Sequence, residues 1–239
     1  MQTTASTRIQ PLVALSAFRK LMRDPEDTHQ VFMIGEALRG KSLARVTARF
    51  RATAFGRDVI EGRHALMPLL ADRDALAALP AGSLGRAYLD FVVAEKLSAE
   101  GLADAAKRRD EMSVVTPEER AFRQHLRDSH DLWHVITGYG RDPLGEICLL
   151  AFTHAQTGLN GLGAIALMGT FRIGRALPGQ PVRQAAGEGR RRGLAATWLP
   201  ETDWGPLMHE ELGEVRRKLG LEAPAAYRGV IHALRPVVA

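Results

Sequence analysis

The feature that most constrains this chain is a group of four candidate metal ligands within seventeen residues: His130, Asp131, His134 and Glu146. The segment before them starts with Thr116-Pro117-Glu118-Glu119, which is the pattern of a helix N-terminus closed by a capping box. Because neither Gly nor Pro follows until Gly138, we expect one helix from about residue 117 to about residue 137. Two histidines four residues apart then share one face of that helix.

A second helix is expected to carry Glu146. Gly138-Tyr139-Gly140 ends the first helix, and Asp142-Pro143 has the pattern of a new start. His134 lies four residues before this break and Glu146 four residues after the cap, so an antiparallel hairpin would place them at equal height. The sequence therefore predicts a helical hairpin that bears a divalent metal.

Asp131 can flank the same face, because it lies three residues before His134. An alternative is that the two histidines are partnered surface residues and that the carboxylates lie on a solvated helix face. Two histidines with one or two carboxylates suit Zn²⁺ and also the facial arrangement of non-haem Fe(II). We expect zinc, with Fe(II) or another first-row divalent ion as the alternative.

The rest of the sequence indicates an all-α fold. Strand-like alternation of apolar and polar residues is nearly absent, and the chain is broken by helix-start signals. They lie at Asp24-Pro25, Ser42, Asp72, Ser83 and Ser98 and near Gly56, and a first helix is expected where Leu12, Leu15, Phe18 and Met22 recur at helical spacing. With 239 residues and 46% apolar content, we predict one domain over residues 1–239, a bundle of about ten helices.

Charge and cysteine content exclude some classes of function. The net charge is +5, but arginine outnumbers lysine 27 to 5, and only Arg190-Arg191-Arg192 forms a cluster. No DNA-binding or RNA-binding module is recognisable, so we expect no nucleic-acid partner. Cys148 is the only cysteine, which excludes an intramolecular disulfide and suggests a small core residue.

The ligand run also resembles the signature of a known family. His130-Asp131-Leu132-Trp133-His134, followed by Glu146, looks like the pattern of the coenzyme Q biosynthesis protein 4 family, which acts in ubiquinone synthesis. The resemblance extends to residues 79–88 and 144–146, and more weakly to residues 214–221. It covers about residues 27–221.

This resemblance implies an all-helical fold, a metal held by the four signature residues, and an apolar channel for a polyprenyl tail. The implied activity is that of a decarboxylase (a lyase): C1 oxidative decarboxylation of a polyprenylated hydroxybenzoate precursor, in which hydroxyl replaces carboxyl. The four signature residues would then be the catalytic residues. Implied partners are other ubiquinone-biosynthesis proteins and the membrane, with a cytoplasmic location peripheral to the inner face of a bacterial membrane. A homodimer is compatible with the sequence.

A glycine-rich stretch over residues 158–169 could form the wall of that channel or could simply be a tightly packed core helix. Arg172 and Arg175 follow it at three-residue spacing, where they could meet an anionic headgroup or be ordinary surface residues. The candidate lipid-binding residues are Leu159, Leu162, Ile165, Met168, Arg172 and Arg175.

Two other functions remain open at this stage. A non-catalytic scaffold could bind the precursor and present it to other pathway enzymes. An HD-type phosphohydrolase would also use a His-Asp pair and a divalent metal, but it would not require His134 and Glu146 at their observed spacing.

Overall fold

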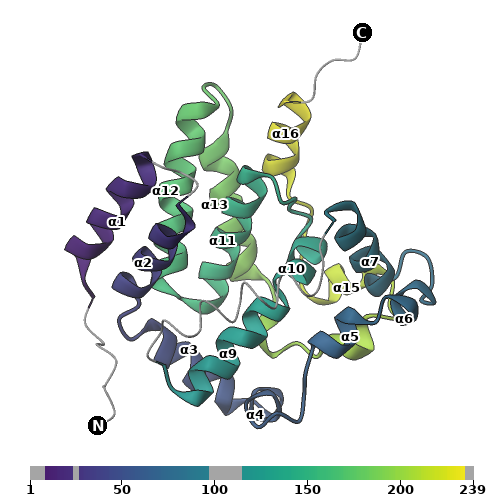
Figure 1. Ribbon diagram of the computed structural model, residues 1–239. Helices are drawn as coiled ribbons and strands as arrows, with labels where there is room; N and C mark the ends of the chain where they lie inside the picture. Colours follow the sequence, from purple (N-terminus) through teal and green to yellow (C-terminus); the bar gives the residue numbers. More distant parts are fainter. Residues whose placement is uncertain (1–8, 24–26, 97–114, 235–239) are drawn as a thin grey trace. The chain divides into compact units, whose positions relative to one another are not determined.

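The computed structural model describes residues 9–23, 27–96 and 115–234, and within these ranges the fold is all-α (Figure 1). The only β-type pairing in the described ranges is an isolated bridge between Ser83 and Glu211. The all-α prediction is confirmed, although the helices are shorter and more numerous than expected. They are α1 Pro11–Arg23, α2 Thr28–Leu38, α3 Ser42–Ala52, α4 Ala54–Ile60, α5 Met67–Ala71, α6 Arg73–Ala77, α7 Leu84–Ala94, α9 Pro117–Asp128, α10 His130–Thr137, α11 Pro143–Thr157, α12 Asn160–Ala176, α13 Val182–Ala195, the 3₁₀-helix η1 Leu199–Glu201, α14 Trp204–Leu207, α15 Leu212–Lys218 and α16 Ala225–Leu234.

Several helix starts agree with the sequence signals. The side chains of Asp72 and Ser83 cap α6 and α7, and α3 begins at Ser42. The expected starts at Asp24-Pro25 and at Ser98 lie outside the described residues.

The described residues fall into two compact units. Unit 1 lies within Ala44–Ile136 and Thr197–Leu221, and unit 2 lies within Ser6–Leu43, Thr137–Ala196 and Glu222–Ala239. The single-domain organisation expected from the sequence stays a prediction.

An aromatic cluster forms the core of unit 1. Phe50 of α3 is fully buried and packs on Phe122 of α9, with ring centroids 5.1 Å apart. The His125 imidazole, one turn further along α9, stacks on Phe50 at 5.3 Å, and Trp198 meets Phe50 edge-on at 6.4 Å. The His125 Nε2 lies 3.0 Å from the Pro200 carbonyl oxygen, so this buried histidine has a polar partner within the core.

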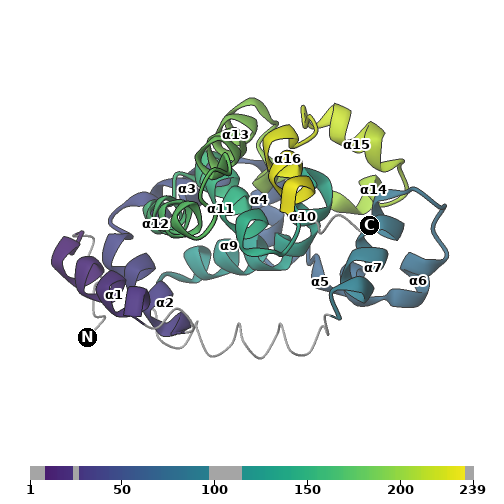
Figure 2. The same cartoon turned by 90° about the horizontal axis from the view of Figure 1, so that it is seen from above.

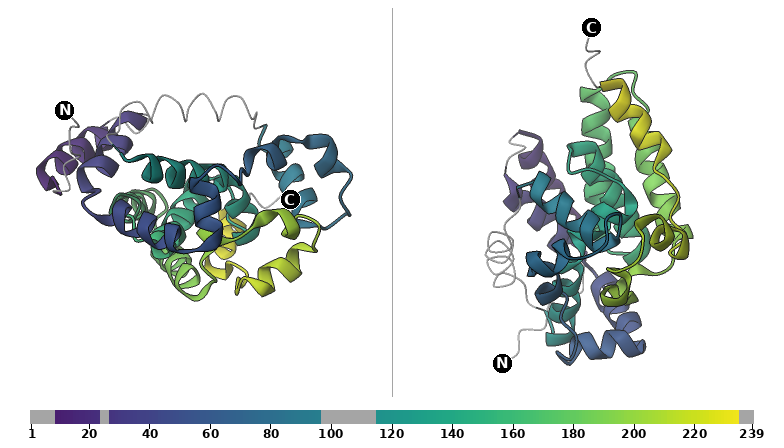
Figure 3. Two further views of the ribbon diagram at one scale, coloured as in Figure 1. Left: turned by 90° about the horizontal axis from the view of Figure 1, so that it is seen from below. Right: turned by 90° about the vertical axis from the view of Figure 1, so that its right-hand side faces the viewer.

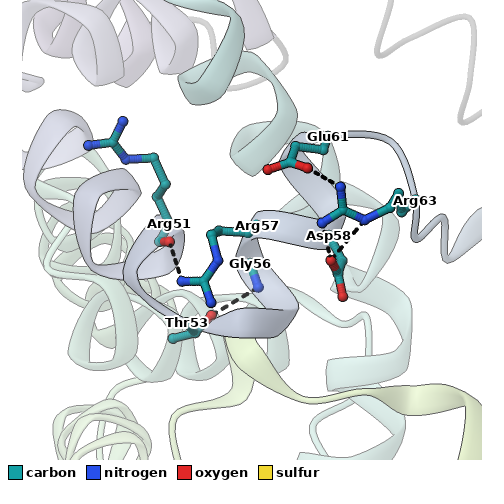
Figure 4. Close-up of polar contacts among 7 residues, drawn as sticks. All are labelled: Arg51, Thr53, Gly56, Arg57, Asp58, Glu61 and Arg63. Carbon is teal, nitrogen blue, oxygen red and sulfur yellow. Dashed lines mark hydrogen bonds and ion pairs between the residues drawn. The ribbon is translucent and has the colours of Figure 1, made fainter.

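The corner between α3 and α4 is a tight turn (Figure 4). The Thr53 hydroxyl accepts a hydrogen bond from the Gly56 N–H at 2.9 Å, and a Cβ at Gly56 would lie only 1.9 Å from the Phe50 carbonyl oxygen. Arg57 donates to the Ala52 carbonyl at 3.0 Å and closes the end of α3. A surface pocket next to this corner is lined by Ala48, Arg51, Ala52, Arg57, Ile60, Glu61 and Glu118. Arg51 pairs there with Glu118, and Glu61 pairs with Arg63, so both carboxylates of the pocket are paired within the protein.

The single helix predicted for residues 117–137 is wrong, because it is divided at Ser129 into α9 and α10. Its start is as expected: Thr116 and Glu119 form a complete capping box. At Ser129 the hydroxyl donates to the His125 carbonyl at 2.9 Å. Such back-bonding by serine bends helices, which accounts for a break that neither Gly nor Pro marks.

Helix α11 is the central helix of unit 2 and packs against α12 and α13, as Figures 1 and 2 show. Cys148, Leu149 and Phe152 of α11 are fully buried, which agrees with the core role expected for the cysteine. Glycines of α13 permit the close approach. A Cβ at Gly189 would lie 2.5 Å from the Cys148 carbonyl oxygen, and one at Gly193 would lie 2.6 Å from that of Phe152.

The first helix, α1, forms as predicted and packs on α2 (Figure 2). Its large apolar residues are not its buried face, however. Leu12 is 81% exposed and Leu15 is 43% exposed, whereas Ala14 and Ala17 are buried.

Candidate metal centre

The two histidines of the predicted site lie at opposite ends of one turn of α10. The Ser129 carbonyl accepts from the Trp133 N–H at 2.9 Å, so the helical hydrogen bonds run through the turn that carries His130 and His134. Their Nε2 atoms are 3.2 Å apart, and their rings are perpendicular with centroids 4.8 Å apart. His134 is 1% exposed, whereas His130 is half-buried.

The spacing of these nitrogens fits metal coordination. Two nitrogens bound to one tetrahedral ion at about 2.0–2.1 Å would be separated by about 3.3 Å. A pair of imidazoles sharing one hydrogen bond would have a similar spacing.

Helix α7 supports this turn within unit 1. The Phe91 ring stacks on the His134 imidazole, with centroids 5.7 Å apart and an angle of 20° between the planes. Asp131 is 7% exposed. Burial raises the pKa of Tyr88, also on α7, to about 12, and the negative charge of Asp131 contributes to the rise. An aromatic residue thus restricts the His134 ring, and a neutral phenol lies within the electrostatic range of Asp131.

Glu146 lies in the first turn of α11, and this turn forms as the sequence predicts. Asp142 is the N-cap: its Oδ1 accepts from the Leu144 N–H at 3.1 Å and from the Gly145 N–H at 3.0 Å. Pro143 takes the first helical position. The Glu146 carboxylate is half-buried, and its Oε1 lies 3.7 Å from the Nε of Arg141.

Two of the four predicted ligands, His130 and His134, come together within unit 1 as a pair of imidazoles. Glu146 belongs to unit 2, and that it joins the two imidazoles at one metal ion stays a prediction. Two imidazole nitrogens and one carboxylate oxygen suit Zn²⁺ and non-haem Fe(II) alike, so this donor set fits a divalent transition metal without selecting one.

The predicted lipid-binding residues all lie on or next to α12. Four of them are half-buried, namely Leu159, Leu162, Ile165 and Met168, and the other two, Arg172 and Arg175, are exposed. The glycines between them lie at close helix contacts: a Cβ at Gly161 would lie 2.7 Å from the Gly35 Cα, and one at Gly169 would lie 2.1 Å from Ile147. Tight packing therefore accounts for these glycines, while the lipid role of the larger residues stays a prediction.

Residues near the candidate ligands that sequence analysis missed are Phe91, Arg141 and Tyr227. Arg141 directly precedes the N-cap Asp142 of α11, so its contact with Glu146 in the first turn could have been predicted from the sequence. Phe91 is 43 residues away from His134 in the chain, and Tyr227 is 85 residues away from Asp142, whose carboxylate its hydroxyl contacts. No local sequence pattern predicts the Phe91–His134 contact or the Tyr227–Asp142 contact.

Within the described residues, no helix is both long and apolar enough to cross a membrane.

The fold and the histidine pair together define a class: an all-α protein with two imidazoles at metal-binding spacing. Residues 2–225 match the family model described as "Coenzyme Q (ubiquinone) biosynthesis protein Coq4". The chain belongs to this family, which acts in ubiquinone biosynthesis.

Relatives and a solved structure agree with this assignment. The chain is 28% identical to the human protein named ubiquinone biosynthesis protein COQ4 homolog, mitochondrial. The alignment spans 218 residues, which are 89% of this chain and 78% of the human one. The chain is also 28% identical over 225 residues to the zebrafish (Danio rerio) protein of the same name, with 92% and 79% covered. A crystal structure from Nostoc punctiforme, of a protein provisionally assigned to ubiquinone biosynthesis, has the same fold, with a TM-score of 0.65 at 22% identity over 90% of this chain and 100% of that one.

Proposed function

We propose that this protein catalyses the C1 oxidative decarboxylation of a polyprenylated hydroxybenzoate precursor of ubiquinone. The observation that carries the proposal is the pair of imidazole nitrogens of His130 and His134 at metal-binding spacing in a chain of the Coq4 family. The reaction removes a ring carboxyl group as carbon dioxide and places hydroxyl at the same carbon, with molecular oxygen as the oxidant.

The protein groups assigned to the metal are the two imidazoles of α10 and the Glu146 carboxylate, with Asp131 as the fourth member of the site. Asp131 supports this assignment by its burial and by its place next to His130 in the same helix. Bound Zn²⁺ would supply positive charge to hold the substrate carboxylate or phenolate, and Fe(II) would add redox chemistry. The perpendicular imidazoles hold their nitrogens on one side of α10, and the stacked Phe91 keeps the His134 ring from rotating away.

Helix α12 is assigned to the polyprenyl tail, and α1 and α12 to contact with a membrane. Both helices carry large apolar side chains in water: Leu12 and Leu15 on α1, and Leu167 and Phe171 on α12, which are 73% and 60% exposed. Basic residues accompany them, including Lys20 and Arg23 at the end of α1 and the exposed Arg172 and Arg175. Apolar side chains flanked by cations suit the surface of an anionic bilayer. We therefore place the protein peripherally on the cytoplasmic face of a bacterial membrane, with other ubiquinone-biosynthesis proteins as partners.

The test is complementation of a bacterial strain that lacks this protein and is deficient in ubiquinone. We expect the wild-type gene to restore ubiquinone, and His130→Ala, His134→Ala and Glu146→Ala to fail at equal protein levels. His209→Ala, which replaces an exposed histidine, is the matched control and should complement. Mass spectrometry of lipid extracts should show a precursor that retains its carboxyl group.

A scaffold would give a different result. If the ligand variants restore ubiquinone, or if the accumulated lipid has already lost its carboxyl group, the decarboxylase assignment is wrong. Purified protein that binds the precursor but never converts it, with either zinc or iron, would favour a scaffold that presents lipid to other enzymes.

A further inference from the structure

The segment that leads into Glu146 is held by a side chain from the C-terminal helix. The Tyr227 hydroxyl of α16 donates to Asp142 Oδ2 and accepts from the Gly140 N–H at 2.9 Å. The other oxygen of the same carboxylate, Oδ1, is the cap of α11 and receives the Leu144 and Gly145 N–H groups. One carboxylate thus joins the start of α11 to α16.

This connection leaves the loop little freedom. A Cβ at Gly145 would lie 2.1 Å from the Gly140 carbonyl oxygen, so the first turn of α11 packs directly on the loop backbone. A Cβ at Gly140 would lie 2.7 Å from the Tyr227 hydroxyl oxygen, so this hydroxyl also lies close to the loop. Both glycines are required by close approach.

Tyr227 is itself fixed in place. Its ring meets the Tyr139 ring edge-on, with centroids 5.3 Å apart and an angle of 77° between the planes. The Glu188 carboxylate of α13 accepts from the Ala226 N–H at 3.0 Å, which ties the first turn of α16 to α13. Figure 3 shows α16 (yellow) running beside the green α13. The hydroxyl is therefore presented to Asp142 by a rigid support.

We propose that Tyr227 is a positioning residue for the metal ligand Glu146 and acts through Asp142. The Glu146 N–H donates to the Asp142 carbonyl at 3.0 Å, so the backbone of the ligand is bonded directly to the cap that Tyr227 orients. Groups that orient a metal ligand in this way commonly change metal affinity by about 10- to 100-fold when they are removed.

Tyr227 lies outside the part of the chain that the family model matches. The match ends at residue 225, two residues before Tyr227. The inference rests on the proposed function, because a positioning role for Tyr227 requires that Glu146 binds the metal.

The first variant is Tyr227→Phe, which removes only the hydroxyl and keeps the ring against Tyr139. Metal affinity of the purified full-length protein is measured by competition between Co²⁺ or Zn²⁺ and a chromophoric chelator, and the absorption spectrum of bound Co²⁺ reports its coordination. We expect about a tenfold loss of affinity and a changed Co²⁺ spectrum, with unchanged helix content by circular dichroism.

The second variant is Asp142→Ser, which keeps a side chain able to cap α11 but is too short to reach Tyr227 as well. It should lose affinity to a similar extent. The double variant should bind metal no more weakly than the weaker-binding single variant, because both changes remove the same Tyr227–Asp142 hydrogen bond. Additive losses would show that Tyr227 and Asp142 act independently and would overturn the proposal.

Tyr139→Phe is the matched control, since it removes the hydroxyl of the neighbouring tyrosine. It should leave metal affinity unchanged even if it lowers the melting temperature. If Tyr227→Phe also lowers only the melting temperature, Tyr227 is structural and the positioning role is refuted. If the wild-type protein itself binds no metal, or if Glu146→Ala binds as tightly as wild type, it is the proposed metal site that fails.

Discussion

Arg141 carries a positive charge that opposes metal binding at Glu146. Its Nε lies 3.7 Å from Glu146 Oε1, so a divalent ion on that carboxylate would lie close to a guanidinium charge. Repulsion over about 5 Å at a water-exposed site amounts to about 1–2 kcal/mol. We therefore expect Arg141→Gln to bind Zn²⁺ about five- to thirtyfold more tightly in chelator competition. Arg183→Gln, an exposed arginine of α13, is the control and should not change the affinity. Weaker binding by Arg141→Gln would mean that Arg141 supports Glu146.

His125 should make the stability of the protein sensitive to acid. Burial lowers its pKa from 6.5 to about 4; the Pro200 carbonyl acts against this shift, and the charge of His64 adds a small further lowering. The folded state thus favours the neutral imidazole. Its contribution is fully present above about pH 6.5 and is lost as the pH falls towards 4, by up to about 3 kcal/mol. Urea unfolding at several pH values should show this loss, and His125→Gln, which stays neutral, should flatten the slope between pH 6.5 and 4. An equal slope in both proteins would contradict the assignment.

At the scale of helices, local signals predicted the starts better than the ends or the contacts. The capping box at Thr116 and the Asp142-Pro143 start depend on residues within one turn, and both are present in the structure. The break at Ser129 depends on a side chain that a helix normally tolerates, so no breaker residue marks it. For α1, the apolar period correctly predicted a helix. Which face would be covered depended on α2 and could not be predicted from the period alone.

The packing of α13 on α11 offers a comparison within one helix. A Cβ at Gly193 would meet the Phe152 carbonyl oxygen at 2.6 Å and the Ala155 Cβ at 2.9 Å, whereas one at Gly187 would meet only the flexible end of Arg191 at 3.6 Å. We expect Gly193→Ala to destabilise the protein by about 1–3 kcal/mol, because the two backbones must separate. Gly187→Ala should instead stabilise it by up to about 1 kcal/mol through helix propensity. Chemical denaturation measures both, and equal effects would show that the helices are not in close contact at Gly193.

At the scale of the whole molecule, the proposed function assigns metal binding and lipid binding to different residues: the four candidate ligands hold the metal and α12 holds the prenyl tail. Placing a charge at Ile165 of α12, as in Ile165→Glu, should abolish binding of a prenylated hydroxybenzoate in vesicles while metal content stays near one ion per chain. Burying a prenyl chain is worth roughly 25 cal/mol per Å², so the tail should dominate affinity for the lipid. Glu146→Ala should do the reverse, by keeping the lipid and losing the metal.

Circular dichroism checks that both variants fold, and Arg183→Glu, an exposed change on α13, controls for the added charge. If both variants lose the same property, or if Ile165→Glu binds lipid as wild type does, α12 does not hold the tail, and its glycine-rich sequence serves packing against α2 and α11 alone.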